Sequence, residues 1–199
     1  MYLAFDTETT DIPRPHLELD HVDQPHLLQF AGILFDERGT ELDRLFTMVR
    51  PGRGALLSTH AFAAHGISLE EAFHRGVETS EVFRWFASAS KRSTCIVGHN
   101  VQFDLQIMAI AAARLGGTGW SIPSNTYCTM THSTPLVNLP PTLRMMAAGR
   151  FHPKSPSLSE CVRHFFGEEH SDAHDAVADV RACIRIFRHL NQNQGTKAA

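Results

Sequence analysis

Lysine, closely spaced cysteines and long apolar runs are all scarce in this chain of 199 residues, and each scarcity excludes a class of protein. Lysine supplies only three of the 18 basic residues and the formal net charge is -3, so bulk positive charge cannot drive binding to nucleic acid. Any such contact must be local. The remaining basic residues are arginines, whose planar fork suits phosphate, although GC-rich coding produces the same excess.

The cysteines and the N-terminal residues exclude further classes. The four cysteines lie far apart with no C-x-x-C spacing, which argues against a zinc site or a disulfide framework. The first six residues lack the basic start of a signal peptide, and no apolar run is long enough to cross a bilayer. We therefore expect a cytoplasmic protein that does not associate with membranes.

The 43% of hydrophobic residues are enough to bury the core of one domain, which we expect over residues 1–190, followed by a short polar C-terminal tail at 191–199. Residues 36–39 have the composition of a hairpin turn. Residues 118–157 show the least clear secondary-structure pattern. The predicted strands are 2–6, 27–35, 42–49, 95–98 and 125–128, and the predicted helices are 57–65, 80–89, 101–115, 130–136, 157–166 and 172–190. This order predicts an α/β fold with a central mixed β-sheet flanked by α-helices.

Three segments carry carboxylates in suggestive places. Asp6 and Glu8 flank Thr7 at the end of the first predicted strand, where a period of two puts both on one side. Taken alone, this pair is better interpreted as the start of a solvated loop, because short motifs recur by accident. Asp104 lies in the first turn of the helix after the second buried strand, where the helix dipole alone would favour an acid.

The third segment is the start of the last predicted helix. His174 and Asp179 are about 140° apart on an ideal helix, so they can act together only if His174 lies in a loose first turn or before it. Asp179 has apolar neighbours, among which a carboxylate is costly unless it is paired or bound to a metal. Asp172 and Asp175 are interpreted as capping residues, with Ser171 or Asp172 at the helix start.

Together these residues form a chemically consistent set. Four hard oxygen donors from three distant segments predict a site for Mg²⁺ or Mn²⁺ rather than for zinc. Two such ions can hold the attacking water and the leaving oxygen of a phosphodiester, and a neutral histidine beside them can serve as the general base.

The same residues resemble three sequence motifs of the DEDDh (DnaQ-like) 3'-5' exonuclease family, which includes RNase T, oligoribonuclease and the proofreading subunit of bacterial DNA polymerase III. The matching segments are residues 5–10 (FDTETT), 98–100 (GHN) with Phe103 and Asp104, and His174-x-Ala176-x-x-Asp179. Residues 65–68 (HGIS) also resemble a segment that these enzymes carry. The resemblance covers about nine tenths of the chain and implies an RNase H-like exonuclease fold.

The resemblance also implies a role for each matching residue. Asp6, Glu8 and Asp179 would hold a first metal ion, Asp6 and Asp104 would hold a second, and His174 would deprotonate the attacking water. Nucleoside 5'-monophosphates would be released from the 3' ends of single-stranded DNA or RNA. The residues expected to bind substrate are Thr7, Thr9, Thr10, Asn100 and Phe103, although Phe103 fits a plain core position equally well.

The chain departs from the family pattern at Asp11. Many relatives have glycine at this position, so the loop over the terminal base is expected to differ.

The motifs are compatible with more than one function. DNA repair and RNA processing of the RNase T or oligoribonuclease type both fit them, as does a homodimer. A non-catalytic nucleic-acid or polymerase-binding module would usually have lost one of the carboxylates. We also expect no tail that docks a polymerase after the last predicted helix. Arg181, Arg185 and Arg188 could follow a nucleic-acid backbone or form a solvated helix face.

Overall fold

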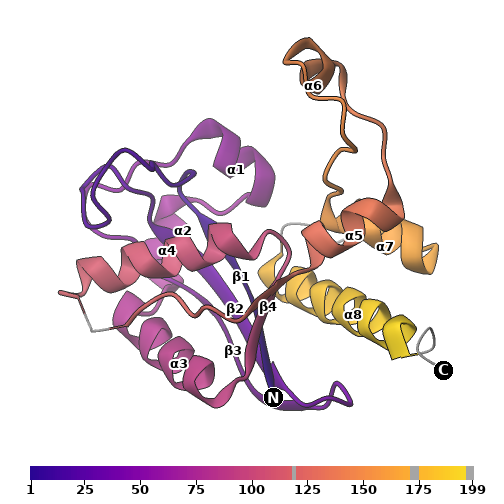
Figure 1. Ribbon diagram of the computed structural model, residues 1–199. Coiled ribbons are helices and arrows are strands. Elements are labelled where there is room, and N and C mark those ends of the chain that lie inside the picture. The colour runs from indigo at the N-terminus through magenta and orange to yellow at the C-terminus, as the bar shows by residue number, and fades with distance from the viewer. Residues whose placement is uncertain (118–119, 171–174, 196–199) are drawn as a thin grey trace.

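A five-stranded mixed sheet in the order β3-β2-β1-β4-β5 forms the centre of the computed structural model, which describes residues 1–117, 120–170 and 175–195 (Figure 1). The strands are β1 (Tyr2–Thr9), β2 (Leu27–Phe35), β3 (Glu41–Met48), β4 (Cys95–Gly98) and β5 (Thr126–Cys128). The first three strands pair antiparallel, whereas β4 is parallel to both β1 and β5. The predicted α/β class and mixed sheet are confirmed.

The predicted hairpin is also present and joins β2 to β3. The carboxylate of Asp36 accepts hydrogen bonds from the backbone amides of Arg38 and Thr40, and Gly39 adopts φ of +86°. A side chain is disfavoured at such a φ, which explains the glycine in this turn.

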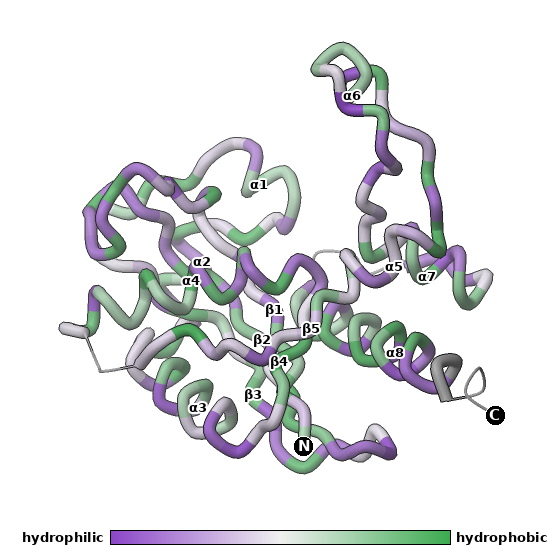
Figure 2. Tube along the Cα trace, viewed as in Figure 1, coloured by the Kyte–Doolittle hydropathy of each residue, from purple (hydrophilic) through white to green (hydrophobic). Residues whose placement is uncertain are grey.

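Helices cover both faces of the sheet, and β1 divides them by the alternation of its side chains. Leu3 and Phe5 pack into a core with α3 (Thr79–Arg92) and α4 (Val101–Arg114), whereas Ala4 packs on the opposite face against α8 (Ala176–Gly195). Figure 2 shows the hydrophobic residues that gather along these central strands. Continuing the alternation places Thr7 on the α4 side and both Asp6 and Glu8 on the α8 side.

The remaining helices are shorter, and two of them were not predicted. They are α1 (Thr59–His65), α2 (Leu69–Arg75), α5 (Thr129–Val137), α6 (Leu143–Ala147) and α7 (Leu158–Phe166). The unpredicted helices, α2 and α6, have seven and five residues, which is too short for an apolar period to show. Their N-caps, Ser68 and Thr142, do accept the expected backbone hydrogen bonds.

The boundaries of α8 differ from the prediction at both ends. The structure starts this helix at Ala176, with Asp175 accepting hydrogen bonds from the amides of Val177 and Ala178. Asp175 is therefore a capping residue as predicted, whereas Ser171, Asp172 and His174 lie outside the described residues. At the other end the helix continues to Gly195, so the first part of the expected polar tail is helical.

Residues 138–157 form an arm that stands away from the sheet, with α6 at its tip (Figure 1). A backbone bridge between Leu139 and Lys154 joins the two limbs of the arm. None of the helices in the described parts of the chain is both long and apolar enough to span a bilayer.

Candidate active site

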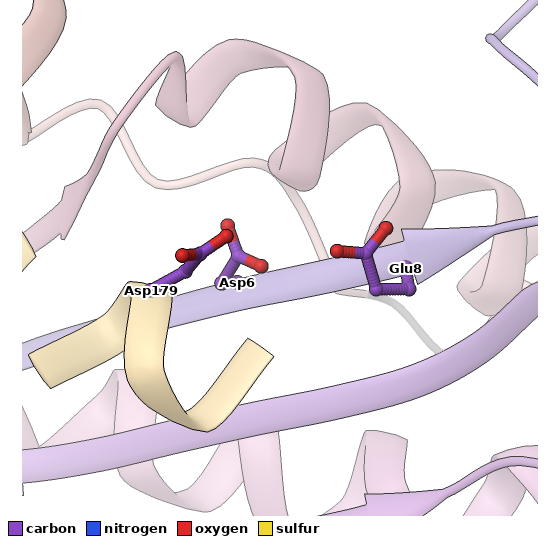
Figure 3. Close-up of side chains that lie close together, drawn as sticks. All are labelled: Asp6, Glu8 and Asp179. Atoms are coloured by element: carbon purple, nitrogen blue, oxygen red, sulfur yellow. The ribbon is translucent and has the colours of Figure 1, made fainter. Parts of the chain in front are cut away.

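Three carboxylates meet at the end of β1 where it faces α8. One oxygen from each of Asp6, Glu8 and Asp179 lies within 4.8 Å of the others (Figure 3). Asp6 and Glu8 reach this point because they are two residues apart on one strand, and Asp179 because the first turn of α8 crosses the same face. A spacing of this size suits one cation held by several oxygens.

The start of α8 is fixed by β2. Gln29 lies opposite Glu8 in the β1–β2 register, and its side-chain oxygen accepts a 3.2 Å hydrogen bond from the amide of Ala176. Together with the Asp175 cap, this contact satisfies amides that a helix leaves unpaired at its first turn. Gln29 thereby positions Asp179. Nothing in the sequence of the strand marks this glutamine for that role.

Asp104 approaches the same place from the opposite face of the sheet. A turn through Asn100, which has φ of +71°, leads from β4 directly into α4 and brings Asp104 into the first helical turn. The hydroxyl of Thr7 donates a 2.7 Å hydrogen bond to Oδ1 of the buried Asp104. Asp104 is thus outside the three-carboxylate group but close enough to Asp6 to raise its pKa.

The electrostatics of the four acids favour a cation. Burial, followed by repulsion from Asp104, Asp179 and the other neighbouring acids, holds the pKa of Asp6 well above its usual range. Burial and the charge of Asp179 raise the pKa of Glu8 to about 8, and burial raises that of Asp104 to about 7 although the Thr7 hydrogen bond opposes the rise. Among the described residues no lysine or arginine contributes to these shifts. The donor set therefore fits a hard divalent ion, which would supply the missing positive charge.

A histidine that the sequence did not single out contacts this cluster. Nε2 of His170 lies 2.5 Å from Oδ1 of Asp179, and the two side chains are only 10% and 12% exposed. His170 falls outside the recognised motifs, which is why sequence reasoning missed it. The histidine expected to act as base, His174, lies outside the described residues.

A cavity of about 120 Å³ opens beside Glu8, between the end of β1, α1 and the first turn of α4. Among the predicted substrate-binding residues, Thr7, Thr9 and Phe103 line it, together with the unpredicted Ile12, Ser58 and His60. Phe103 also packs against the core, so this residue has both a cavity-lining side and a core-facing side. Thr10 instead accepts a hydrogen bond from the amide of His26, and Asn100 forms the turn before α4.

Residues 65–68 connect this cavity to the fold. Nδ1 of His65 accepts a hydrogen bond from the amide of Ile67, so Nε2 carries the proton and donates to the carbonyl oxygen of Thr9 at 3.1 Å. Gly66 ends α1 with φ of +70°, and Ser68 caps α2. The segment therefore holds α1 against the end of β1 through the imidazole of His65, which bonds the backbone of Thr9.

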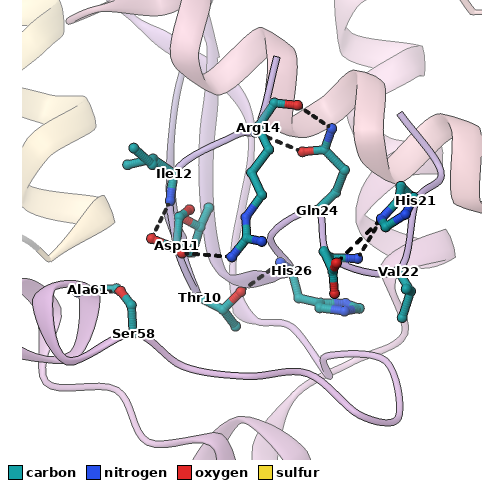
Figure 4. A network of polar contacts seen from close by, with 12 residues as sticks. Thr10, Asp11, Ile12, Arg14, His21, Val22, Gln24, His26, Ser58 and Ala61 are labelled. Atoms are coloured by element: carbon teal, nitrogen blue, oxygen red, sulfur yellow. Dashed lines mark hydrogen bonds and ion pairs between the residues drawn. The ribbon is translucent and has the colours of Figure 1, made fainter. Parts of the chain in front are cut away.

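The loop of residues 11–26 is held from inside by Gln24, which is only 2% exposed (Figure 4). Its amide group bonds both the amide and the carbonyl of Arg14 and also the carbonyls of Leu17 and Glu18. Arg114, in the last turn of α4, donates to the carbonyls of Pro25, Gln24 and His21. The loop is thus attached to the same helix that carries Asp104.

Two arginines of the row on α8 have partners away from the carboxylates. Arg185 pairs with both carboxylate oxygens of Glu168, and the guanidinium of Arg181 lies over the ring of Phe46. These contacts place Arg181 and Arg185 on the side of α8 that faces α7 and the β2–β3 hairpin, which favours a structural role for them.

Comparison with known proteins gives one family and one fold. A family model described as exonuclease matches residues 3–187. No curated protein matches the chain. E. coli exonuclease I in complex with a dT13 oligonucleotide is similar with a TM-score of 0.72 and 22% identity, over 98% of this chain and 42% of that one.

Two other solved structures of the same protein agree. The complex of E. coli exonuclease I with dA16 gives a TM-score of 0.73 and 23% identity over 98% of this chain and 41% of that one. The zinc-bound E. coli complex with single-stranded DNA gives 0.72 and 23% over 98% and 41%. The chain spans about two fifths of the length of these relatives, and the likeness confirms the expected RNase H-like exonuclease fold.

Proposed function

The chain belongs to the exonuclease family, and on that premise we propose that it removes nucleotides one at a time from the 3' end of single-stranded nucleic acid. The observation that carries this function is the meeting of Asp6, Glu8 and Asp179 at one point, with Asp104 across the strand. Four carboxylates would repel a phosphodiester, so the site can accept one only with cations bound. Residues 1–190 act in this function as one exonuclease domain.

The cofactor is Mg²⁺ or Mn²⁺, with two ions in the site. Asp6, Glu8 and Asp179 would hold the first ion, and Asp6 and Asp104 the second. Bound ions of this kind offset the charge of the phosphodiester and lower the pKa of water. Because the pKa values of Glu8 and Asp104 are raised to about 8 and about 7, metal binding must release protons from these residues at neutral pH.

The general base is His174, five residues before Asp179. His170 has a different role, because its imidazole lies against Asp179 and can hold that carboxylate in place. Replacing His174 by alanine should lower kcat about 100-fold or more across neutral pH. His170→Ala should cost about tenfold and weaken Mn²⁺ binding, because a positioning contact is lost. A larger loss of kcat in His170→Ala than in His174→Ala would show that His170 is the base.

The nucleotide to be removed occupies the cavity beside Glu8. Thr7, Thr9 and Phe103 line this cavity, so the terminal sugar and base would contact the end of β1 and the first turn of α4. Thr10 would support the cavity through its contact with His26, and Asn100 through the turn before α4. DNA is the preferred substrate class, since the similar exonuclease I structures hold DNA oligonucleotides.

The deciding experiment is a time course on single-stranded DNA and a matching RNA, both labelled at the 5' end, with Mg²⁺, Mn²⁺ or EDTA. A ladder that shortens from the 3' end only when metal is present is expected, with the faster substrate identifying DNA or RNA. Asp104→Asn is the control, because it removes the charge and keeps the shape. Intact binding without cleavage of either substrate by the wild type would overturn the function in favour of a non-catalytic binding module.

A further inference from the structure

The arm of residues 138–157 is the part of the molecule that the proposed chemistry leaves without a role. It leaves the body after α5, carries α6 at its tip and returns at α7 (Figure 1). A five-residue helix cannot bury a core of its own, and the described side chains of α6 include no buried residue. Packing within the domain therefore does not explain which residues occur in α6.

The charge of the arm differs from that of the rest of the chain. No aspartate or glutamate occurs between Asp104 and Glu160, although the chain has a net charge of -3. Arg144 and Arg150 are exposed and make no ion pair with any described residue. By contrast, Lys154 at the base of the arm is bonded to both oxygens of Glu160. Two guanidinium groups near the tip are thus available to an anionic partner.

Apolar side chains accompany these charges. Leu143 is 82% exposed and Phe151, which follows Arg150, is 72% exposed. Large apolar side chains that are exposed on one short segment, beside arginines, are typical of a contact surface. An aromatic ring next to arginines is the combination that binds single-stranded nucleic acid, because the ring stacks on a base while the cations contact phosphates.

The base of the arm lies next to the carboxylate site. His99 follows β4 directly, and its Nε2 contacts the carbonyl oxygen of Pro156 at 3.1 Å while its Nδ1 contacts the hydroxyl of Thr129 at 3.0 Å. Asp104 lies only five residues further along the chain, in the first turn of α4. The arm and α1 rise from the same end of the sheet (Figure 1). The carboxylates meet at the end of β1.

We propose that the arm binds the single-stranded nucleic acid on the 5' side of the nucleotide that is being removed, with Arg144 and Arg150 on phosphates and Phe151 on a base. This inference rests on the proposed function, since it assumes that the 3' terminal nucleotide occupies the cavity beside Glu8. A substrate that fills only the cavity cannot reach the arm, whereas a longer one can. The arm therefore determines affinity for long substrates and leaves the chemistry unchanged.

The test compares a triple variant, R144A/R150A/F151A, with the wild type on two thymidine oligonucleotides, a trinucleotide and one of about 20 residues. We expect kcat/KM to fall about tenfold or more on the long substrate and to stay unchanged on the trinucleotide. The slope of the logarithm of the binding constant against the logarithm of the salt concentration should become shallower by about 1.4, as expected for two lost phosphate contacts on a single strand. R144K/R150K should restore most of that slope.

The matched control is R84A/K91A, which removes two exposed positive charges from α3. It should leave both substrates unaffected. Equal losses on both substrates, or no loss on the long one, would overturn the inference. So would a triple variant that keeps its affinity for DNA and RNA but loses affinity for an acidic peptide, because the arm would then be a protein-binding surface.

Failure of the inference can be separated from failure of the proposed function. Fluorescence anisotropy with the long oligonucleotide and Mg²⁺, with Asp104→Asn introduced into both the wild type and the triple variant, measures binding without cleavage. A wild type that binds but does not cleave would refute the nuclease and still test the arm, since the triple variant must bind more weakly. A triple variant with wild-type affinity would refute the arm even in an active enzyme.

Discussion

The hydroxyl of Thr7 on β1 donates a 2.7 Å hydrogen bond to Oδ1 of Asp104 on α4, across the layer boundary between sheet and helix. Thr7 lies between Asp6 and Glu8, so three consecutive residues serve both faces of one strand. The two outer side chains supply carboxylates to the α8 side, and the middle one holds the fourth carboxylate on the other side. The strand thereby fixes three of the four acids relative to one another, whereas the fourth, Asp179, comes from α8.

Replacing Thr7 by valine should shift the pH dependence of cleavage. The hydrogen bond lowers the pKa of Asp104, so its loss raises that pKa further above about 7 and protonates more of the carboxylate at neutral pH. We expect the acidic limb of the pH–rate profile to move up by about one unit, with a loss of about fivefold at pH 7 that recovers at higher pH. Thr7→Ser keeps the hydroxyl and should behave as the wild type. A loss that is equal at every pH would contradict this role.

Glu8→Gln should stabilise the metal-free protein at alkaline pH. The pKa of Glu8 is raised from 4.5 to about 8 in the folded state, so its protonated form contributes stability below pH 4.5. This contribution is lost as the pH rises toward 8, whereas glutamine does not titrate. The difference in unfolding free energy between variant and wild type should grow by about 3–4 kcal/mol from pH 5 to pH 8.

Chemical denaturation in EDTA at several pH values measures this difference. Addition of Mg²⁺ should stabilise the wild type more at pH 8 than at pH 5, because protons compete with the ion for the carboxylates. Glu8→Gln should gain less from the ion at either pH. A stability difference that does not change with pH would show that Glu8 is not held in its protonated form by the fold.

Gln29→Ala should loosen the start of α8. The variant removes the acceptor for the amide of Ala176 and should cost about 1 kcal/mol, as the loss of a helix cap does. Because Asp179 lies in the first turn of the same helix, Mn²⁺ affinity measured by calorimetry should fall several-fold. Gln102→Ala, at an exposed position on α4, is the control. Unchanged Mn²⁺ affinity in Gln29→Ala would mean that Asp179 is positioned by other contacts.

Gln24→Ala should release the loop of residues 11–26. Four hydrogen bonds of a buried amide are lost, and we expect a cost of about 2 kcal/mol with faster hydrogen exchange in this loop. KM should rise while kcat changes little, because Asp11 and Ile12 line the cavity but do not hold the metal. Arg114→Lys should act in the same direction, since one ammonium cannot replace a fork that spans three carbonyls. Unaltered exchange in Gln24→Ala would contradict this account.

Long apolar patterns made the scaffold predictable. The strands 27–35 and 95–98 were predicted with the boundaries that the structure gives them, and the apolar stripe after residue 100 predicted α4. The structure brings three of the predicted carboxylates together and places the fourth across the strand, because each of three distant segments ended a buried strand or began a helix near the sheet.

The contacts that position these acids could not be predicted in the same way. Gln29 and His170 reach α8 through tertiary packing, and neither has a local pattern that marks it. The short helices α2 and α6 depend on caps more than on an apolar period. The order of the loop of residues 11–26 could not be predicted, because it comes from one buried glutamine and one distant arginine.

The carboxylates that meet on the α8 side of β1 come from residues 6, 8 and 179, so the third is synthesised long after the first two. A nascent chain that has not yet emerged as far as α8 lacks a complete set of ligands and cannot assemble the site. Nuclease activity would therefore begin only after nearly the whole domain has left the ribosome.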